Sequence, residues 1–167
     1  EEGITKLELA TYYQGIADWI LPHIANRPMV LVRCPAGRRK ECFYQKHPGK
    51  GTPDVLRQIP VREKSKTEPY VVVDNVAGLI ALAQISALEI HAWGSRADKL
   101  ESPDRLIFDL DPAEDVAWGF VVQSARKVRE LLQYLGLKSF VKTTGGKGLH
   151  VVAPIDRRHD WDEAKEF

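Results

Sequence analysis

The chain has 167 residues, of which 44% are hydrophobic and 28% charged, and its formal net charge is +1 at pH 7. That length is sufficient for one globular domain, or a compact pair of subdomains, with a buried core. No apolar run approaches the roughly 20 residues of a membrane helix, and the acidic N-terminus lacks the pattern of a secretory signal. We therefore expect a cytoplasmic protein without a membrane partner, with Cys34 and Cys42 as reduced thiols.

Positive charge is concentrated in residues 27–66, which hold eleven Lys and Arg residues and three acids. A basic segment in a nearly neutral protein is typical of a surface that binds the phosphate groups of nucleic acids. A solvated loop rich in Lys and Arg explains the same composition, so charge alone leaves both interpretations open.

The first half of the chain predicts helices mixed with short strands. Thr5 and Glu8 have the spacing of a capping box, and apolar residues continue at helical intervals, which predicts a helix over 5–25. Strands are expected at 29–33, 41–47, 59–63 and 69–75, with a short helix at 53–57. Residues 75–87 are apolar on nearly every side and predict a buried helix, which a strand at 88–93 follows.

The polar loop 94–104 is a candidate boundary between an N-terminal α/β subregion (1–98) and a catalytic subregion (104–167). In the latter we expect a strand at 105–111, a helix capped by Asp115 and ended by Gly136, strands at 138–144 and 149–154, and a helix from 161. This β-α-β-β-α order is one strand short of the ferredoxin-like unit. The predicted fold class is α/β (α+β), with a mixed N-terminal region packed on a partial RRM-like (ferredoxin-like) core.

Asp109 and Asp111 are the first candidates for chemistry. Two residues apart in a strand, their side chains project from one face, and Pro112 places them at the rim of the sheet. Converging carboxylates can hold the hard divalent cations that two-metal phosphoryl transfer requires. Acids that cap the next helix explain the same pair. The segment also resembles the first motif of haloacid dehalogenase-type phosphatases, although Pro112 and Ala113 stand where that motif usually has Gly and then Thr or Val.

The second candidate is the glycine-rich segment 143–150. Its glycines allow backbone N–H groups to point at an anion, and its lysine, threonine and histidine add charge and hydrogen-bond donors. The residues concerned are Thr144, Gly145, Gly146, Lys147, Gly148 and His150. Taken alone, such a hairpin is more often a simple turn, and it is not a Walker A loop because Gly follows the GK pair. A β-α-β crossover would place both candidates in one sheet, where they could hold a nucleoside triphosphate with its metal ions.

Four segments, taken together, indicate a family. They are ECFYQKHPGKG (41–51), LEIHAWGS (88–95), LIFDLDP (106–112) and VKTTGGKGLHVVAP (141–154). In order and spacing, along essentially the whole chain, they resemble the polymerase domain of bacterial and archaeal DNA ligase D, a primase-polymerase of the archaeo-eukaryotic primase superfamily. The resemblance implies a nucleotidyltransferase of non-homologous end joining that adds NTPs or dNTPs to a 3′ end.

The resemblance also implies roles for individual residues. Asp109 and Asp111 match ligands of two catalytic Mn²⁺ or Mg²⁺ ions. The glycine-rich set, with Thr144 in place of the family's usual Ser, matches the motif that contacts the incoming triphosphate, and His91 matches a histidine near the nucleotide. The residues implied to bind DNA are Lys6, at a 5′-phosphate, and Phe43, Tyr44, Lys46 and His47, near the template strand. Implied partners are DNA with breaks or gaps, fused ligase or nuclease domains, and Ku, in a nucleoid-associated protein.

One departure from the family concerns its third metal-binding Asp, which lies on a later strand. This chain ends at Phe167, and Asp156, Asp160 and Asp162 follow the second motif too closely to match it. We therefore expect residues 1–167 to be a single primase-polymerase domain that is incomplete at its C-terminus and is inactive, or nearly so, by itself. A DNA-end-binding module without catalysis is the alternative from another class, and the phosphatase is the third hypothesis.

Overall fold

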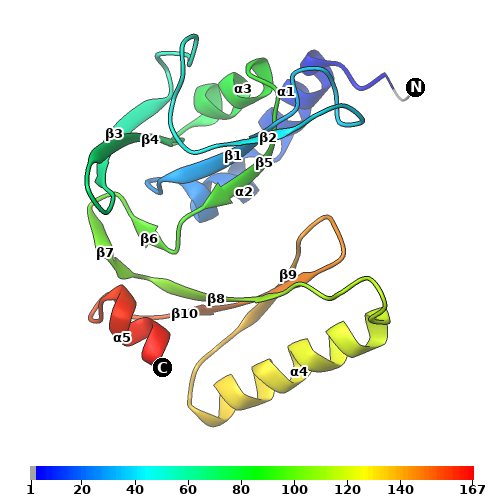
Figure 1. The fold of residues 1–167 in the computed structure, drawn as a ribbon, viewed down its shortest axis with the longest axis vertical. Helices are drawn as coiled ribbons and strands as arrows, with labels where there is room; N and C mark the ends of the chain where they lie inside the picture. The colour runs from blue at the N-terminus through cyan, green and yellow to red at the C-terminus, as the bar shows by residue number, and fades with distance from the viewer. Residues whose placement is uncertain (1–2) are drawn as a thin grey trace. The chain divides into compact units, whose positions relative to one another are not determined.

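The computed structural model describes residues 3–167, in which the chain forms two compact units that divide between Asp98 and Lys99 (Figure 1). The elements of the first unit are α1 (Lys6–Gly15), α2 (Ala17–Ile24), β1 (Met29–Arg33), β2 (Phe43–Gln45), β3 (Arg57–Arg62), β4 (Thr67–Val72), α3 (Val76–Gln84), β5 (Ala87–Ala92) and β6 (Ser95–Arg96). Those of the second are β7 (Lys99–Pro103), β8 (Arg105–Leu110), α4 (Trp118–Tyr134), β9 (Phe140–Thr143), β10 (Leu149–Pro154) and α5 (Trp161–Glu166). None of the helices in residues 3–167 has both the length and the apolar character of a membrane span.

The first helical segment begins as predicted but is divided in two. The Thr5 hydroxyl accepts the Glu8 N–H at 3.2 Å while the Thr5 N–H donates to the Glu8 carboxylate at 2.7 Å, which confirms the capping box. The single helix over 5–25 is wrong, because Ile16 leaves helical geometry (φ −101°, ψ 6°) and separates α1 from α2.

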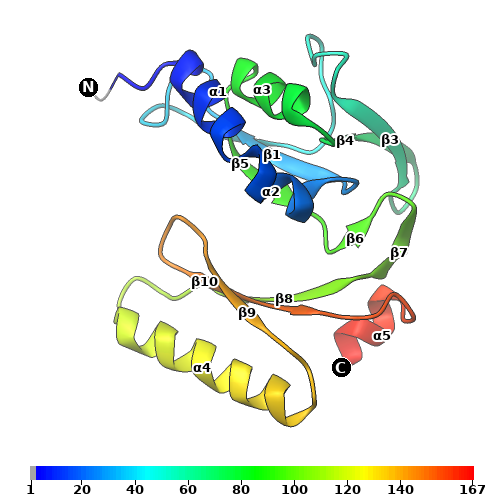
Figure 2. The same cartoon turned by 180° about the vertical axis from the view of Figure 1, so that it is seen from behind.

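Strand β1 organises the five-stranded antiparallel sheet of the first unit. Strand β5 pairs with β1 along one edge, β2 and β4 pair with it on the other, and β3 continues outward from β4. Met29 and Leu31 of β1 point into a core shared with α1, α2 and α3, which cover one face of this sheet (Figure 2). Val30 and Val32 alternate with these residues along β1 and point to the opposite face. Their cross-strand partners His91 and Tyr44 therefore lie on that face as well.

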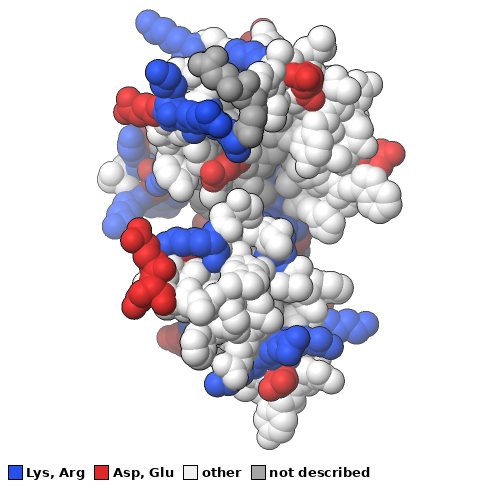
Figure 3. All heavy atoms as spheres, turned by 90° about the vertical axis from the view of Figure 1, so that its right-hand side faces the viewer, with Lys and Arg blue, Asp and Glu red and all other residues white. Residues whose placement is uncertain are grey.

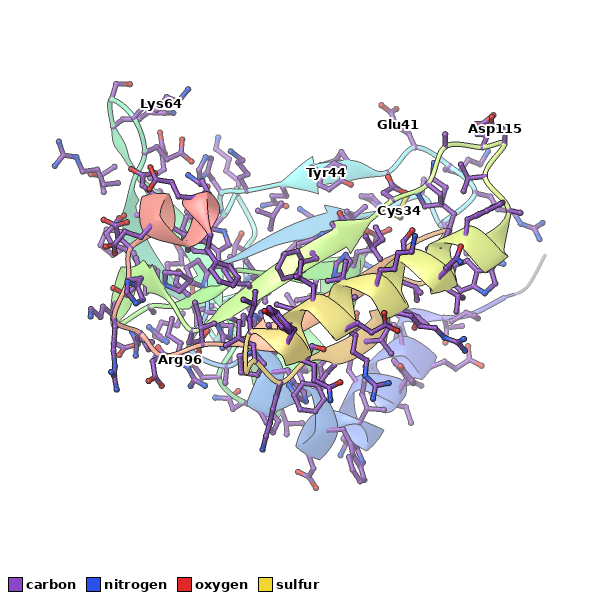
Figure 4. All side chains as sticks on the ribbon, turned by 90° about the horizontal axis from the view of Figure 1, so that it is seen from below. Cys34, Glu41, Tyr44, Lys64, Arg96 and Asp115 are labelled. Atoms are coloured by element: carbon purple, nitrogen blue, oxygen red, sulfur yellow. A yellow bond between two sulfur atoms is a disulfide. The ribbon has the colours of Figure 1, made fainter. Side chains whose placement is uncertain are left out.

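The two cysteines form a disulfide, so the expectation of reduced thiols is wrong for this structure. The β1–β2 pairing explains why: Arg33 lies opposite Phe43, and the next residue outward on each strand is a cysteine, Cys34 (labelled in Figure 4) and Cys42. Their Cα atoms are 4.4 Å apart, within the range that a disulfide spans. The bond closes the connection that contains Arg38, Arg39 and Lys40.

The second unit has the strand order β8-β10-β9 with antiparallel neighbours, so β8 and β9 run parallel with β10 between them. This is the expected partial ferredoxin-like arrangement. Val121, Ala125 and Leu132 of α4 pack on one face of this sheet against alternate residues of β8 and β10 (Figure 1). The remaining side chains of these strands point to the other face of the sheet.

Three local expectations are wrong and one is confirmed. Asp115 lies in a turn before α4, whose N-cap is Ala117 without a side-chain hydrogen bond (Figure 4). Residues 53–57 form a turn in which the Leu56 N–H donates to the Pro53 carbonyl, not a helix. Strand β7 occupies part of the segment expected to be loop. Gly136, at φ +77°, ends α4 as predicted.

The pair Arg57–Asp74 gives a first prediction, on pH-dependent stability. The Arg57 Nε atom lies 2.6 Å from the Asp74 carboxylate, which also accepts the Asn26 N–H at 2.9 Å, so three chain segments meet here. The Arg57 hydrogen bond holds the pKa of Asp74 below its ordinary 3.8. Asp74→Asn should therefore lower the free energy of unfolding by about 0.5–1 kcal/mol at neutral pH, as a partly exposed ion pair does.

Because the folded pKa of Asp74 is depressed, this stabilisation is complete above pH 3.8 and disappears as the pH falls through the lowered value. Urea unfolding of wild type and Asp74→Asn over that range measures it, with Asp54→Asn, at an exposed acid, as the control. A difference that does not depend on pH would contradict the assignment.

The disulfide gives a second prediction. The double variant Cys34→Ser/Cys42→Ser should lose about 2–3 kcal/mol of unfolding free energy, because closing a short loop restricts the unfolded chain. Reducing agent should destabilise the wild type by the same amount and leave the double variant unchanged. Two titratable thiols in the oxidised native protein would show that the bond does not form in solution.

Candidate active site

Asp109 and Asp111 lie on the face of the β8-β10-β9 sheet that α4 does not cover. Their neighbours Phe108 and Leu110 pack into the core beneath α4, so alternation along the strand turns both acids to the opposite side. Both carboxylates are accessible, with side-chain exposures of 63% and 65%. The sequence prediction that the two acids share one face at the rim agrees with this geometry.

The glycine-rich segment joins β9 to β10 and lies against the end of β8. His150 is opposite Asp109 in the β10–β8 register, and its Nε2 atom is 3.4 Å from the Asp109 Oδ1 atom. One turn residue, Lys147, places its Nζ atom 3.8 Å from the Asp111 Oδ1 atom. The structure therefore brings each acid beside one cationic or titratable group of the glycine-rich segment.

Gly148 makes this approach possible. A Cβ atom at this position would lie 2.8 Å from the Leu110 carbonyl oxygen, a separation that real Cβ atoms essentially never have. Gly145 is required for a different reason, since its φ of +84° is in the left-handed region. The two glycines thus have separate tasks, close packing and turning.

Thr144 organises the turn from within. Its hydroxyl donates to the Gly148 carbonyl at 3.1 Å and accepts the Gly146 N–H at 3.4 Å. A serine hydroxyl could make the same two bonds. In this structure Thr144 therefore shapes the anion-binding candidate from inside the turn.

The acids fit part of a divalent-cation site. Carboxylate oxygens are the ligands that Mn²⁺ and Mg²⁺ prefer, and Asp109 and Asp111 supply two accessible carboxylates on one side of the sheet. Within residues 3–167, no three acidic, histidine or cysteine side chains converge as a metal-binding group. Asp109 and Asp111 would thus supply two of the ligands of a bound ion.

In the first unit, the candidate aromatic pair does not form one platform. Tyr44 is 71% exposed on the sheet face that α1–α3 do not cover, and its ring centroid lies 5.8 Å from that of His91. Phe43 points to the other side of β2, where the Arg33 guanidinium lies 5.6 Å from its ring centroid. The structure brings Tyr44 together with His91 and separates both from Phe43.

The remaining residues predicted to bind DNA differ in availability. Lys46 is exposed just after β2. His47 is partly buried: its Nδ1 atom is 3.1 Å from the Pro69 carbonyl and its ring packs edge-on against Tyr70. Lys6 donates to the Gln84 carbonyl at 2.7 Å, at the C-terminal end of α3, where a positive charge is favourable. His47 and Lys6 thus have structural contacts in addition to any ligand.

Two neighbours were missed when the candidates were chosen from the sequence. The Glu89 carboxylate oxygen lies 2.8 Å from the His91 Nε2 atom. Lys142 lies opposite His150 in the β9–β10 register. Glu89 lies two residues from His91 in β5, so the two-residue period of a strand would have identified it. Lys142 is marked only by its register opposite His150.

Charged side chains of both signs occur on the face drawn in Figure 3, separated by wide neutral areas. Lys64, in the segment between β3 and β4, and Tyr44 are labelled in Figure 4. The face in Figure 3 therefore does not carry a single sign of charge.

Comparisons with known proteins agree with the geometry. The family described as "LigD, primase-polymerase domain" matches residues 5–167. The chain is 37% identical over 164 residues to the multifunctional non-homologous end joining protein LigD of Pseudomonas aeruginosa. This match covers 98% of this chain and 19% of that protein. It is 38% identical over 162 residues to the corresponding LigD of Mycobacterium tuberculosis, covering 92% of this chain and 21% of the relative.

A solved structure is similar as well. The polymerase domain from Mycobacterium tuberculosis ligase D, in complex with DNA, superposes with a TM-score of 0.82 at 38% identity, covering 91% of this chain and 56% of that one. The chain thus spans about half of that solved domain and about a fifth of the length of the two LigD relatives.

The close contact of Gly148 gives a third prediction. Gly148→Ala should lower the free energy of unfolding by about 1–3 kcal/mol, because the new methyl group must displace the backbone of β8. Thermal unfolding followed by circular dichroism measures the loss. Gly146→Ala is the matched control, since its Cβ would meet nothing closer than the Thr144 hydroxyl at 3.9 Å. Equal stability of the two variants would contradict the packing argument.

Proposed function

Because the chain belongs to the family of LigD primase-polymerase domains, we propose that it acts in nucleotidyl transfer to the 3′ ends of broken or gapped DNA during non-homologous end joining. The substrates would be NTPs or dNTPs selected by a template strand. The observation that supports this most directly is the convergence of two rim carboxylates with the glycine-rich segment 143–150, each acid lying within 4 Å of a group from that segment.

Asp109 and Asp111 would hold the divalent cations, Mn²⁺ or Mg²⁺, and their exposure on one side of the sheet suits that task. When bound, such ions lower the pKa of an attacking hydroxyl and neutralise charge on a departing pyrophosphate. The pairing of β8 with β10 positions Asp109, and Asp111 follows directly after the end of β8.

The glycine-rich turn would bind the triphosphate. The turn has backbone N–H groups at Gly145, Gly146 and Gly148, the Lys147 amine adds a mobile positive charge, and His150 adds a ring nitrogen. The Thr144 hydroxyl keeps the turn in shape through its bonds to Gly146 and Gly148. Lys147 and His150 now face the acids, so a metal-bound triphosphate would take over contacts that they make with Asp111 and Asp109.

In the first unit, Tyr44 is the residue best suited to stack on a template base, because its ring is largely exposed and aromatic stacking tolerates any base. Phe43 would support β2 from the other side. His91 would lie near the nucleotide, Lys46 near the phosphate backbone, and Lys6 near a 5′-phosphate. DNA would be a partner, as in the solved structure of the Mycobacterium tuberculosis polymerase domain. Ku and fused ligase or nuclease domains are further partners that the family resemblance implies.

The other two hypotheses are not favoured by the comparisons, which match a polymerase domain over nearly the whole chain. Each of these two hypotheses predicts a different experimental result. A DNA-end-binding module would bind DNA without binding a metal–nucleotide complex, and a phosphatase would hydrolyse simple phosphate esters without forming longer DNA.

The proposal gives a fourth prediction. Asp109→Asn should weaken Mn²⁺ binding, measured by calorimetry or paramagnetic resonance, by about tenfold or more, equivalent to roughly 1.4 kcal/mol. Removing the charge of an exposed carboxylate should leave the fold intact. Asp115→Asn is the control, because this acid lies in the connection before α4 and is not expected to bind the ion (Figure 4).

Primer extension on gapped DNA with Mn²⁺ and NTPs tests the reaction itself. We expect low extension by the 167-residue chain and none by Asp109→Asn. Extension that persists in Asp109→Asn would rule out the assigned role, and DNA binding without nucleotide binding would favour the end-binding module.

A further inference from the structure

Lys142 lies in a row of three side chains that crosses the second sheet. In the antiparallel register, Lys142 of β9 is opposite His150 of β10, which is opposite Asp109 of β8. Residues that are opposite one another in neighbouring strands point to the same face. An amine, an imidazole and a carboxylate therefore follow one another across the face that α4 leaves uncovered.

The surroundings of Lys142 differ from those of Lys147. The Lys147 Nζ atom lies 3.8 Å from a carboxylate oxygen of Asp111, whereas the Lys142 side chain has no hydrogen bond or ion pair with any of residues 3–167. Desolvation by the sheet lowers the pKa of Lys142, nearby Arg105 lowers it further, and Asp109 acts in the opposite direction. The charge on Lys142 is thus not balanced by a close protein carboxylate, and an anion would improve its environment.

Lys142 is also adjacent to the anion-binding candidate. It is the residue before the last one of β9, and β9 leads directly into the glycine-rich turn (Figure 2). A polyphosphate bound at the turn would extend toward one of the two strands that flank the turn. Lys142 is on β9, the strand that leads into the turn. The chemistry that this arrangement recognises is a chain of phosphate groups.

We propose that Lys142 binds a phosphate oxygen of the incoming triphosphate, as an additional cation beside Lys147 and His150. The inference rests on the proposed function, since it adds a residue to the same site. Lys142 contributes a charge-assisted hydrogen bond to the polyphosphate and makes no contact with the metal ion or the base.

The test measures dissociation constants of the 167-residue chain for three probes: Mn²⁺ alone, Mn²⁺ with tripolyphosphate, and Mn²⁺ with ATP. Lys142→Gln should weaken binding of both polyphosphates by about tenfold, a loss typical of one charge-assisted bond. Lys142→Arg should restore most of the affinity. Lys138→Gln, which removes an exposed lysine before β9, is the matched control and should bind like the wild type.

The metal probe separates binding from structural damage. Affinity for Mn²⁺ alone should be unchanged or slightly higher in Lys142→Gln, because a cation near Asp109 has been removed. Equal weakening for all three probes would overturn the inference by showing a disturbed fold, as would unchanged affinity for both polyphosphates. Weaker ATP binding with unchanged tripolyphosphate binding would also overturn it, because the contact would then be to the nucleoside.

The proposed function and the role of Lys142 can fail separately. Wild-type protein that binds neither polyphosphate in the presence of Mn²⁺ would overturn the proposed function and, with it, the role of Lys142. Wild-type binding that Lys142→Gln retains in full would overturn the role of Lys142 alone.

Discussion

The contact between the Gly148 backbone and the Leu110 carbonyl determines how closely the glycine-rich turn can approach the two aspartates. No other residue fits there, because any Cβ would meet that oxygen at 2.8 Å. The register that follows from this contact places His150 opposite Asp109 and Lys147 near Asp111. The proposed metal and phosphate sites would therefore meet at the end of the pairing between β8 and β10.

Much of the fold followed from local rules. The capping box at Thr5, the helix end at Gly136 and the β-α-β-β order of the second unit depend on residues close together in the sequence, and the structure confirms them. The errors have tertiary causes or weak local signals. The predicted cap at Asp115 failed because that acid lies in a turn before the helix, and the disulfide depends on a hairpin register that sequence spacing does not specify.

The sequence predicts which side chains of one strand share a face. It does not predict which side chains of adjacent strands become neighbours. Alternation placed Asp109 and Asp111 on one face, and the same rule kept Phe43 and Tyr44 from sharing one. Which side chains become neighbours on adjacent strands depends on register, and a shift of one residue would exchange the two faces. Lys142 was overlooked for that reason: its importance depends on lying opposite His150, which no short motif specifies.

The hydrogen bond from Lys6 to the Gln84 carbonyl has a thermodynamic consequence for a lysine that resembles a 5′-phosphate ligand. The amine cannot give its full hydrogen-bonding capacity to both partners, so engaging a DNA terminus would compete with its support of the last turn of α3. The observed affinity for that terminus would then be a difference between two interactions. If Lys6 binds a 5′-phosphate as proposed, a change that loosens the end of α3 would release the amine and strengthen DNA binding, even where the changed residue touches no nucleotide.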